Sequence, residues 1–430
     1  MPQRPNILYI LTDQQSADAM SCAGNEDLRT PAMDSLAEAG VRFENAYCTQ
    51  PLCSPSRASM FTGMMPRQAG VPRNGMAISA ERRAGGVGLL LRQAGYECAY
   101  GGKWHVPEIS IPEGHGFEQI CPFGDDVLAE ACAKFLGRKH DRPFFLVASF
   151  DNPHNICEYA RNMPLPWGAI GDAPPPQDCP NLPANFAIPP YEPEAIRVEQ
   201  RADHNIYPTV AFTEDDWRRY RWGYCRLIEK VDAEIARVLD ALRAGGLEDR
   251  TLVIFSSDHG DGHAEHQWSQ KSVLYEAEVR VPLTVSFKGV SLAGGVDRTH
   301  LVSNGLDLLP TLCDYAGAQP PAGVQGRSLR PLIEGGHTPS WRDGLVVETV
   351  FDGTRGYRTQ GRMVRTDRYK YVAYDWGRCR EQLFDLQADP GEMVNLAVEA
   401  GRRELLADLR NRLAGWCRTT DDNFCPRRKY

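Results

Sequence analysis

Three apolar runs, each followed directly by polar residues, constrain the fold of this chain more than any other feature. They are residues 7–11, 143–150 and 251–257. A short, uninterrupted apolar run is typical of a strand buried on both faces of a parallel sheet. Open α/β sheets hold their ligands at the carboxyl ends of such strands, so we expect chemistry where these runs end. The polar residues found there include Asp13, Asp151, His154, Asp258 and His259.

Helical segments separate the expected strands. Residues 29–40 and 86–95 have the length of short helices, and each ends in glycine. A longer helix is expected over residues 213–246, because a capping-box pattern at its start is followed by apolar residues at helical spacing. Strands that alternate with helices predict an α/β fold with a doubly wound, mostly parallel sheet.

The pattern along the chain predicts two domains and one excursion. Residues 1–340 hold the three runs and form the main α/β domain. Within it, residues 155–212 are rich in proline and lack periodicity, so we expect a long ordered excursion over the active face. Residues 341–430 change to short strands such as 344–350 and end in a helix near 402–416. They predict a smaller α+β subdomain with a small antiparallel sheet.

Charge and hydropathy exclude several classes of partner. The 430 residues carry a formal net charge of −8 without any long basic run, which argues against nucleic acid or an anionic membrane as a partner. An anionic substrate would have to be held by a local cluster of cations. No stretch approaches the roughly 20 apolar residues that span a bilayer.

The amino terminus and the cysteines bear on location. The first residues are too short and too abruptly polar for a secretory leader, so the chain as it stands is expected in the cytoplasm. Removal of a leader from a longer precursor would instead place it in the periplasm or outside the cell. The 13 cysteines show no C-x-x-C pairs, and we expect all but one to be ordinary thiols of a reducing compartment.

The exception is Cys53, which opens the most specific motif of the chain. The segment from Cys53 through Arg57 to Gly63 reads C-S-P-S-R-A-S-M-F-T-G. It matches C-x-P-S-R-x-x-x-x-T-G, the signature of type I sulfatases, in which the cysteine is oxidised to Cα-formylglycine after translation. Five further residue types at fixed offsets make this match far more specific than a lone glycine-rich loop.

The resemblance to sulfatases extends over nearly the whole chain and implies the alkaline-phosphatase-like fold. It also implies maturation by a formylglycine-generating enzyme or an anaerobic sulfatase-maturing enzyme. The segments that carry it, besides the Cys53 motif, are residues 5–8, 102–105, 152–154, 258–260, 270–276, 280–283, 365–370 and 382–390.

The residue types in these segments suit the hydrolysis of a sulfate monoester, which needs a divalent cation, positive side chains and proton donors. Each residue taken alone has a structural explanation, such as a turn or a surface charge, and only the combination indicates a site. The expected metal ligands are Asp13, Gln14, Cys53, Asp258 and His259. The other expected catalytic residues are Arg57, Lys103, His105, His154 and Lys271.

The resemblance also implies an order of steps. One hydroxyl of hydrated formylglycine 53, which Arg57 would hold, attacks sulfur, and His154 or Lys271 protonates the departing alcohol. His105 then takes the proton of the second hydroxyl, so that sulfate leaves by C–O cleavage and the aldehyde returns.

Two positions depart from the commonest sulfatase pattern. Gln14 stands where many sulfatases have a second aspartate, and His259 stands where many have asparagine. The ligand set is therefore less negative than a three-aspartate cage. Calcium is the expected ion, with magnesium and manganese as alternatives. The same pairs occur in relatives that cleave phosphodiesters and phosphonate monoesters, which keeps such a hydrolase as the alternative function.

We expect the substrate to be a sulfated saccharide, because aromatic residues that suit sugar rings crowd the excursion and the C-terminal part. A small aryl or choline ester is the alternative substrate. A glycan-binding protein with unconverted Cys53 is the non-enzymatic alternative. The residues expected to bind substrate are His266, Arg73, Asn74, Arg355 and Arg378.

Overall fold

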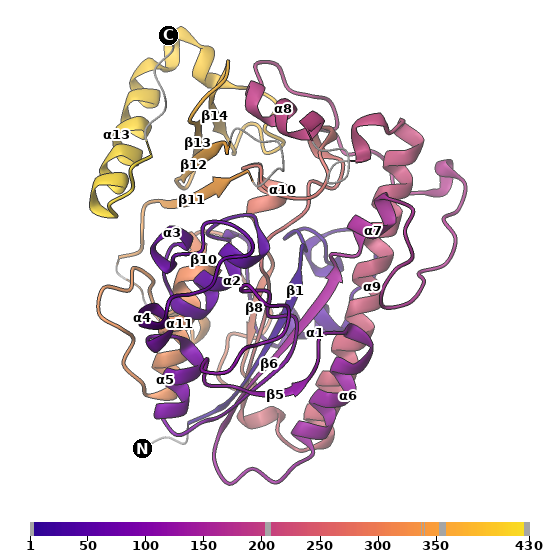
Figure 1. Cartoon of the computed structure of the whole chain (residues 1–430), viewed down its shortest axis with the longest axis vertical. Coiled ribbons are helices and arrows are strands. Elements are labelled where there is room, and N and C mark those ends of the chain that lie inside the picture. Colours follow the sequence, from indigo (N-terminus) through magenta and orange to yellow (C-terminus); the bar gives the residue numbers. More distant parts are fainter. Residues whose placement is uncertain (1–3, 203–207, 337, 339, 352–357, 425–430) are drawn as a thin grey trace.

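The computed structural model describes residues 4–202, 208–336, 338, 340–351 and 358–424. Its centre is an eight-stranded sheet with the order β5-β4-β6-β1-β7-β8-β2-β9 (Figure 1). β1 pairs in parallel with β6 on one side and β7 on the other, so the three apolar runs form adjacent strands. β8 runs antiparallel to both of its neighbours. The strands are β1 (Asn6–Asp13), β2 (Val41–Phe43), β4 (Glu97–Gly102), β5 (Glu118–Cys121), β6 (Phe144–Pro153), β7 (Thr251–Ser257), β8 (Leu283–Ser286) and β9 (Gly295–Asp297).

Helices cover both faces of this sheet, as a doubly wound fold requires (Figure 1). On one face lie α1 (Pro31–Ala39), α6 (Asp125–Leu136) and α9 (Glu214–Ala244), packed with Leu8 and Ile10 of β1. On the other lie α2 (Cys53–Thr62), α5 (Val87–Gln93) and α11 (Asn304–Ala316), packed with Ile7, Tyr9 and Leu11. The apolar run of β1 therefore serves two cores, because successive side chains of a strand point to opposite faces.

The expected helices are confirmed, with ends shifted by one to three residues. The capping box of α9 forms as predicted, with the Thr213 hydroxyl accepting from the Asp216 amide and the Asp216 carboxylate accepting from the Thr213 amide. Further short elements are α3 (Pro66–Ala69), α4 (Ala80–Ala84), α10 (Glu276–Val279), α12 (Arg330–Ile333), and β3 (Ala46–Tyr47) paired with β10 (Val302–Ser303).

The expected ordered excursion over residues 155–212 includes helices, which its lack of sequence periodicity did not suggest, and its place over the active face stays a prediction. It contains α7 (Ile156–Ala160) and α8 (Glu194–Ala202). α8 buries Glu199 and Gln200 as well as Ala195 and Ile196. α8 is only nine residues long and follows a proline-rich stretch, so its amphipathic pattern is too short to stand out from the irregular sequence around it.

The C-terminal part forms the predicted smaller α+β subdomain, at the top of Figure 1. Its antiparallel sheet has the order β11-β12-β13-β14, and α13 (Arg403–Thr419) packs on it through Leu406, Leu409 and Leu413. The division at residues 340 and 341 stays a prediction. The strands are β11 (Leu345–Val350), β12 (Gln360–Arg365), β13 (Tyr369–Tyr374) and β14 (Glu381–Asp385).

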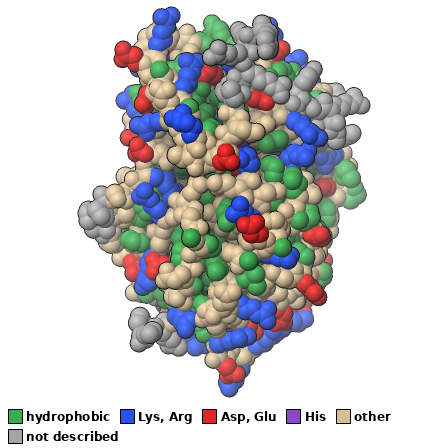
Figure 2. Space-filling view, turned by 60° about the vertical axis from the view of Figure 1, so that its left-hand side comes forward, with side chains coloured by type: hydrophobic (Ala, Val, Ile, Leu, Met, Phe, Trp, Pro, Cys, Tyr) green, Lys and Arg blue, Asp and Glu red, His purple; other side chains and the backbone are tan. Residues whose placement is uncertain are grey.

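The surface shows little segregation of charge on the face drawn in Figure 2, where Lys and Arg side chains are interspersed with Asp and Glu. Among the described helices, none has both the length and the apolar character needed to cross a membrane.

Candidate active site

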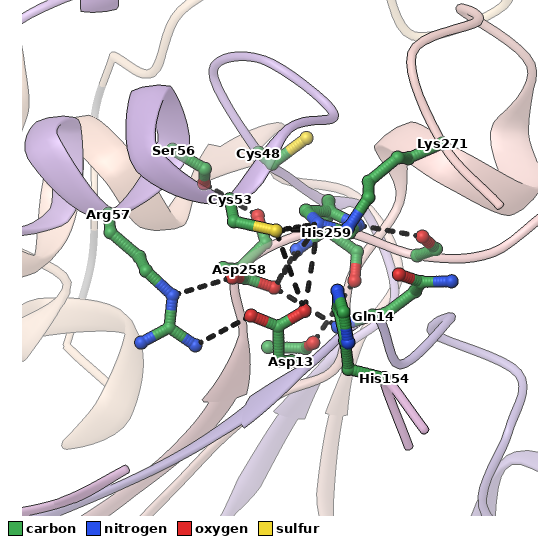
Figure 3. Close-up of polar contacts among 12 residues, drawn as sticks. Asp13, Gln14, Cys48, Cys53, Ser56, Arg57, His154, Asp258, His259 and Lys271 are labelled. Atoms are coloured by element: carbon green, nitrogen blue, oxygen red, sulfur yellow. Dashed lines mark hydrogen bonds and ion pairs between the residues drawn. The ribbon is translucent and has the colours of Figure 1, made fainter. Parts of the chain in front are cut away.

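The candidate site lies where several carboxyl ends of strands meet the amino end of α2 (Figure 3). β1 ends at Asp13, and β4 and β7 end directly before Lys103 and Asp258. α2 begins at Cys53, which points toward these residues. Parallel strands deliver their carboxyl ends to one edge of the sheet, so residues far apart in the sequence become neighbours.

Two buried carboxylates form the base of the site. The guanidinium of Arg57 contacts both, with Nη2 at 3.1 Å from Asp13 Oδ2 and Nε at 2.7 Å from Asp258 Oδ2. Lys103 Nζ lies 2.8 Å from the same Asp13 oxygen. Burial and the charge of Asp13 raise the pKa of Asp258. Burial also opposes ionisation of Asp13, but Lys103 and other cations outweigh it and hold the pKa of Asp13 well below its ordinary value.

The remaining oxygens of the two carboxylates fit a divalent cation. Ligand atoms of Asp13, Cys53, Asp258 and His259 all lie within 4.8 Å of one another. His259 Nδ1 lies 2.8 Å from the Gly260 carbonyl, and donation there leaves Nε2 as the ligand atom. This Nε2 lies 3.9 Å from Asp13 Oδ1 and 3.7 Å from Asp258 Oδ1. Two carboxylate oxygens and an imidazole nitrogen around one point are a donor set that could hold a metal.

Gln14 lies beside this group but is held by other contacts. Its backbone N–H donates to Asp258 Oδ1 at 3.1 Å, and its side-chain Nε2 donates to Asp261 Oδ2 at 2.7 Å. Its φ of +71° is in the left-handed region, which costs energy for a residue with a side chain. The structure thus places Gln14 next to the ligands, with its amide oxygen left as an acceptor.

The Cys53 sulfur lies among charged groups. Lys271 Nζ is 3.0 Å from Sγ, His259 Nε2 is 3.3 Å away, and Asp13 Oδ1 is 3.7 Å away. Burial and Asp13 oppose ionisation of the thiol, but Lys271, His259 and Lys103 outweigh them and hold the pKa of Cys53 well below its ordinary value. Position 53 is therefore a place where negative charge is stabilised.

A further buried carboxylate, that of Asp151, contacts Lys103. Asp151, on β6, lies 2.9 Å from Lys103 Nζ, and its other oxygen accepts from Asn155 Nδ2 and Trp167 Nε1, each at 2.8 Å. His154 follows β6, and its Nδ1 is 4.0 Å from Asp151 Oδ1. The His154 side chain is 23% exposed, so it borders the solvent side of the site.

His105 and Asn74 flank the start of α2. The Ser54 hydroxyl donates to the His105 carbonyl at 2.5 Å, and the Ser54 N–H donates to Asn74 Oδ1 at 3.0 Å. His105 has a φ of +59°, and its buried Nδ1 has no partner among the described residues. Arg73, next to Asn74, is half-buried.

The other residues expected to bind substrate do not join this group. The buried ring of His266 stacks on Tyr275, and its Nε2 lies 2.9 Å from the Gly391 carbonyl. Arg378 is 81% exposed and pairs with Glu194 at the start of α8. Arg355 lies outside the described residues. The roles assigned to all the expected site residues stay predictions.

The structure adds two buried acids that the sequence interpretation did not assign to the site, Asp151 and Asp261. Asp151 ends a strand that was predicted, and the Lys103 motif could have suggested a partner for it. Asp261 follows the Asp258 motif directly, but nothing local marks it as different from a turn residue.

The chain belongs to the sulfatase family. The sulfatase family profile matches residues 5–124 and 123–318, and a profile named N-sulphoglucosamine sulphohydrolase, C-terminal, matches residues 264–418. The family and its characterised members make this protein a sulfuric ester hydrolase. The expectations of a sulfatase and of its alkaline-phosphatase-like fold are thereby confirmed.

Individual relatives extend over nearly the whole chain. A Delta 4,5-hexuronate-2-O-sulfatase of Bacteroides thetaiotaomicron is 31% identical, over 98% of this chain and 90% of the relative. A choline-sulfatase of Rhizobium meliloti is 29% identical, over 92% of this chain and 82% of the relative. The solved structure of a 2-O GAG sulfatase superposes with a TM-score of 0.88 at 29% identity, over 98% of this chain and 93% of that one.

Proposed function

We propose that this protein hydrolyses a sulfate monoester on a saccharide and releases inorganic sulfate. The observation that carries the proposal is the setting of Cys53 at the start of α2, between Lys271, His259 and Asp13. That setting stabilises a negatively charged nucleophile and a negatively charged leaving group. The saccharide part is supported by relatives whose names specify sulfated sugars, among them the hexuronate sulfatase and an N-acetylglucosamine-6-O-sulfatase of the same organism.

Conversion of Cys53 to formylglycine would supply an aldehyde whose hydrate is the nucleophile, and a divalent cation would supply positive charge to the sulfate oxygens. Asp13, Gln14, Asp258 and His259 would hold that cation together with residue 53. We propose calcium, because hard oxygen ligands predominate, and magnesium and manganese are the ions to compare.

The cationic side chains divide their tasks according to their contacts. Arg57 is fully buried and committed to Asp13, Asp258, the Lys103 carbonyl and Ser149, so it holds the ligands in place. Lys271 lies 3.0 Å from the Cys53 sulfur and Lys103 lies 2.8 Å from Asp13, and their charge would stabilise the oxygens of a sulfate bound at residue 53.

Two histidines would transfer protons. His154 borders solvent beside Asp151 and would give a proton to the departing alcohol. His105 would take a proton from residue 53 when sulfate is expelled, and its buried Nδ1, which has no partner among the described residues, supports this role.

A substrate screen tests the proposal. The full chain, matured at residue 53, is offered defined sulfated mono- and disaccharides, choline sulfate and an aryl sulfate, and released sulfate is measured by ion chromatography. We expect the largest kcat/KM with a saccharide and no turnover after removal of metal by a chelator. Preference for choline sulfate or the aryl ester would contradict the saccharide assignment.

Maturation is measured separately by intact mass. Formation of the aldehyde from Cys53 removes about 18 Da, because SH₂ is exchanged for oxygen. The Cys53→Ala variant should show no such loss. Sulfate release by a chain of unchanged mass would contradict the formylglycine proposal.

A phosphodiester or phosphonate monoester hydrolase is the second candidate. Gln14 and His259 favour it, because the family resemblance implies that the same residue pairs occur in relatives that cleave these esters. Rates with a sulfate and a phosphodiester of one aryl alcohol decide between the two, and faster cleavage of the phosphodiester would favour the second candidate.

A further inference from the structure

Asp261 is a fully buried acid outside the proposed set of ligands and catalytic groups, and its carboxylate is saturated with hydrogen bonds. Oδ2 accepts from Gln14 Nε2 at 2.7 Å and from the Gln270 N–H at 3.0 Å. Oδ1 accepts from the His263 N–H at 2.8 Å, and the Tyr220 hydroxyl lies 3.0 Å from both oxygens. A buried carboxylate is tolerated only with such a set of hydrogen-bond donors. Asp261 and the groups that donate to it therefore hold one another in position.

The contact with Gln14 determines which end of the side-chain amide faces the metal ligands. An ionised carboxylate only accepts hydrogen bonds, so the amide nitrogen must turn to Asp261. The amide oxygen is then the end of the group that remains as an acceptor, and the Cys157 sulfur lies 3.8 Å from this oxygen and 3.6 Å from the amide nitrogen. The backbone of Gln14 is also fixed, since the Tyr224 hydroxyl donates to its carbonyl at 2.7 Å.

The contact with Gln270 reaches the other half of the site. Gln270 has a φ of +65° and directly precedes Lys271, whose Nζ lies 3.0 Å from the Cys53 sulfur. His263 also has a positive φ, of +48°, so Asp261 holds two strained positions of the segment that presents Lys271. Strained backbone of this kind persists only where the surroundings determine it.

We propose that Asp261 is a positioning residue, which turns the amide oxygen of Gln14 toward the metal and holds the segment that carries Lys271. The inference rests on the proposed function, because it assumes that Gln14 serves as a metal ligand. Asp261 itself touches neither the metal nor the substrate.

The test measures calcium binding to the full matured chain by titration calorimetry, without substrate. Asp261→Asn keeps the size of the side chain but turns one acceptor into a donor that faces other donors. We expect calcium affinity to fall roughly 10- to 100-fold, as for other groups that orient metal ligands. Asp232→Asn is the matched control, because Asp232 is also buried and accepts two backbone N–H groups, but it lies between α1 and α9. It should lose stability and keep its calcium affinity.

A double-mutant cycle separates positioning from general damage. If Asp261 acts through Gln14, Asp261→Asn should change calcium affinity by less than about twofold in a Gln14→Ala background. An equal loss in both backgrounds, or wild-type affinity in Asp261→Asn, would overturn the proposal. Gln14→Asn is an independent variant that keeps Asp261 but withdraws the amide by one methylene, and it should lose affinity as Gln14→Ala does. Wild-type affinity in Gln14→Asn would also overturn it.

The outcomes also distinguish this inference from the proposed function. A chain that shows the coupling but releases no sulfate from any saccharide would refute the proposed function alone. A chain that releases sulfate while Asp261→Asn binds calcium normally would refute the positioning role alone.

Discussion

Position 53 lacks the apolar surroundings that usually explain a buried cysteine, since its sulfur contacts Lys271, His259 and Asp13. We therefore expect Cys53→Ala to abolish sulfate release and to change the free energy of unfolding by about 1 kcal/mol or less, because no apolar packing is lost. Ion chromatography and thermal unfolding measure the two effects. Retained turnover would reject residue 53 as the nucleophile.

Arg57 neutralises two buried carboxylates at once, Asp13 and Asp258. Arg57→Met removes the guanidinium from both carboxylates, with Asp13 keeping its contact with Lys103, and should cost about 3–5 kcal/mol of stability in a chelator. The loss should be smaller in calcium, because a bound cation would take over part of the neutralisation. Thermal unfolding in both solutions measures the difference.

Arg362 provides the matched control for Arg57. It is also fully buried, and its Nε lies 2.7 Å from Asp422 Oδ2, far from the proposed ligands in the fold. Arg362→Met should lose comparable stability without any benefit from calcium. An equal calcium effect in the two variants would mean that the ion does not act between Asp13 and Asp258.

At the scale of single residues, the sulfatase-like motifs were sufficient to bring Asp13, Arg57, Lys103 and Lys271 together in one expected group. Asp261 could not be assigned in the same way, because its role is created by a partner 247 positions away. His266 shows the reverse problem. Its place in the sequence indicated substrate, but its ring is committed to Tyr275 and the Gly391 carbonyl.

At the scale of elements, α1 and α9 are joined by Asp232, whose oxygens accept the N–H groups of Ala32 and Met33 in the first turn of α1. Burial raises the pKa of Asp232 to about 6, although these two bonds lower it. The folded chain therefore binds this proton more tightly than the unfolded chain does. The resulting stabilisation is complete below the ordinary pKa of 3.8 and is lost as pH rises through about 6.

This linkage predicts a pH-dependent difference between the wild type and Asp232→Asn. The melting temperature of the wild type minus that of the variant should decrease as pH rises from 4 to 7, as measured by scanning calorimetry. Asp240→Asn, at an exposed position of the same helix, is the control. The melting temperature of the wild type minus that of Asp240→Asn should stay constant across this range. A constant difference for Asp232→Asn would contradict the assignment.

Long elements with regular patterns were predictable, and short ones with buried polar residues were not. α9 has both a capping box and apolar periodicity, so its existence and its start followed from the sequence. α8 offers an amphipathic pattern of only nine residues, and its Arg197 and Gln200 donate to the carbonyls of His266 and Gln267. Its conformation depends on these long-range contacts, which a local pattern does not contain.

At the scale of the whole molecule, a buried ion cluster joins the C-terminal sheet to the main domain. Lys370 of β13 is fully buried, with Nζ at 3.0 Å from Glu276 of α10 and 2.7 Å from Glu392. Lys370→Met should therefore cost about 3–5 kcal/mol, because the buried Glu392 and the partly buried Glu276 lose this cation.

The control for Lys370 is Lys288→Met, since Lys288 also pairs with two carboxylates but is 56% exposed. It should cost much less stability than Lys370→Met, because water screens an exposed ion pair. Both values come from denaturant unfolding at neutral pH. Equal losses would show that burial does not govern the energy of the Lys370 cluster.

The reversed direction of β8 has a consequence for how this scaffold can vary. β7 ends at the catalytic edge, and β8, being antiparallel, begins there. Residues 258–282 therefore never cross to the far side of the sheet, as a connection between parallel strands must. Insertions or deletions in this stretch would alter the mouth of the site and leave the order of strands intact. The stretch is thus a natural place for substrate range to diverge among proteins that share this architecture.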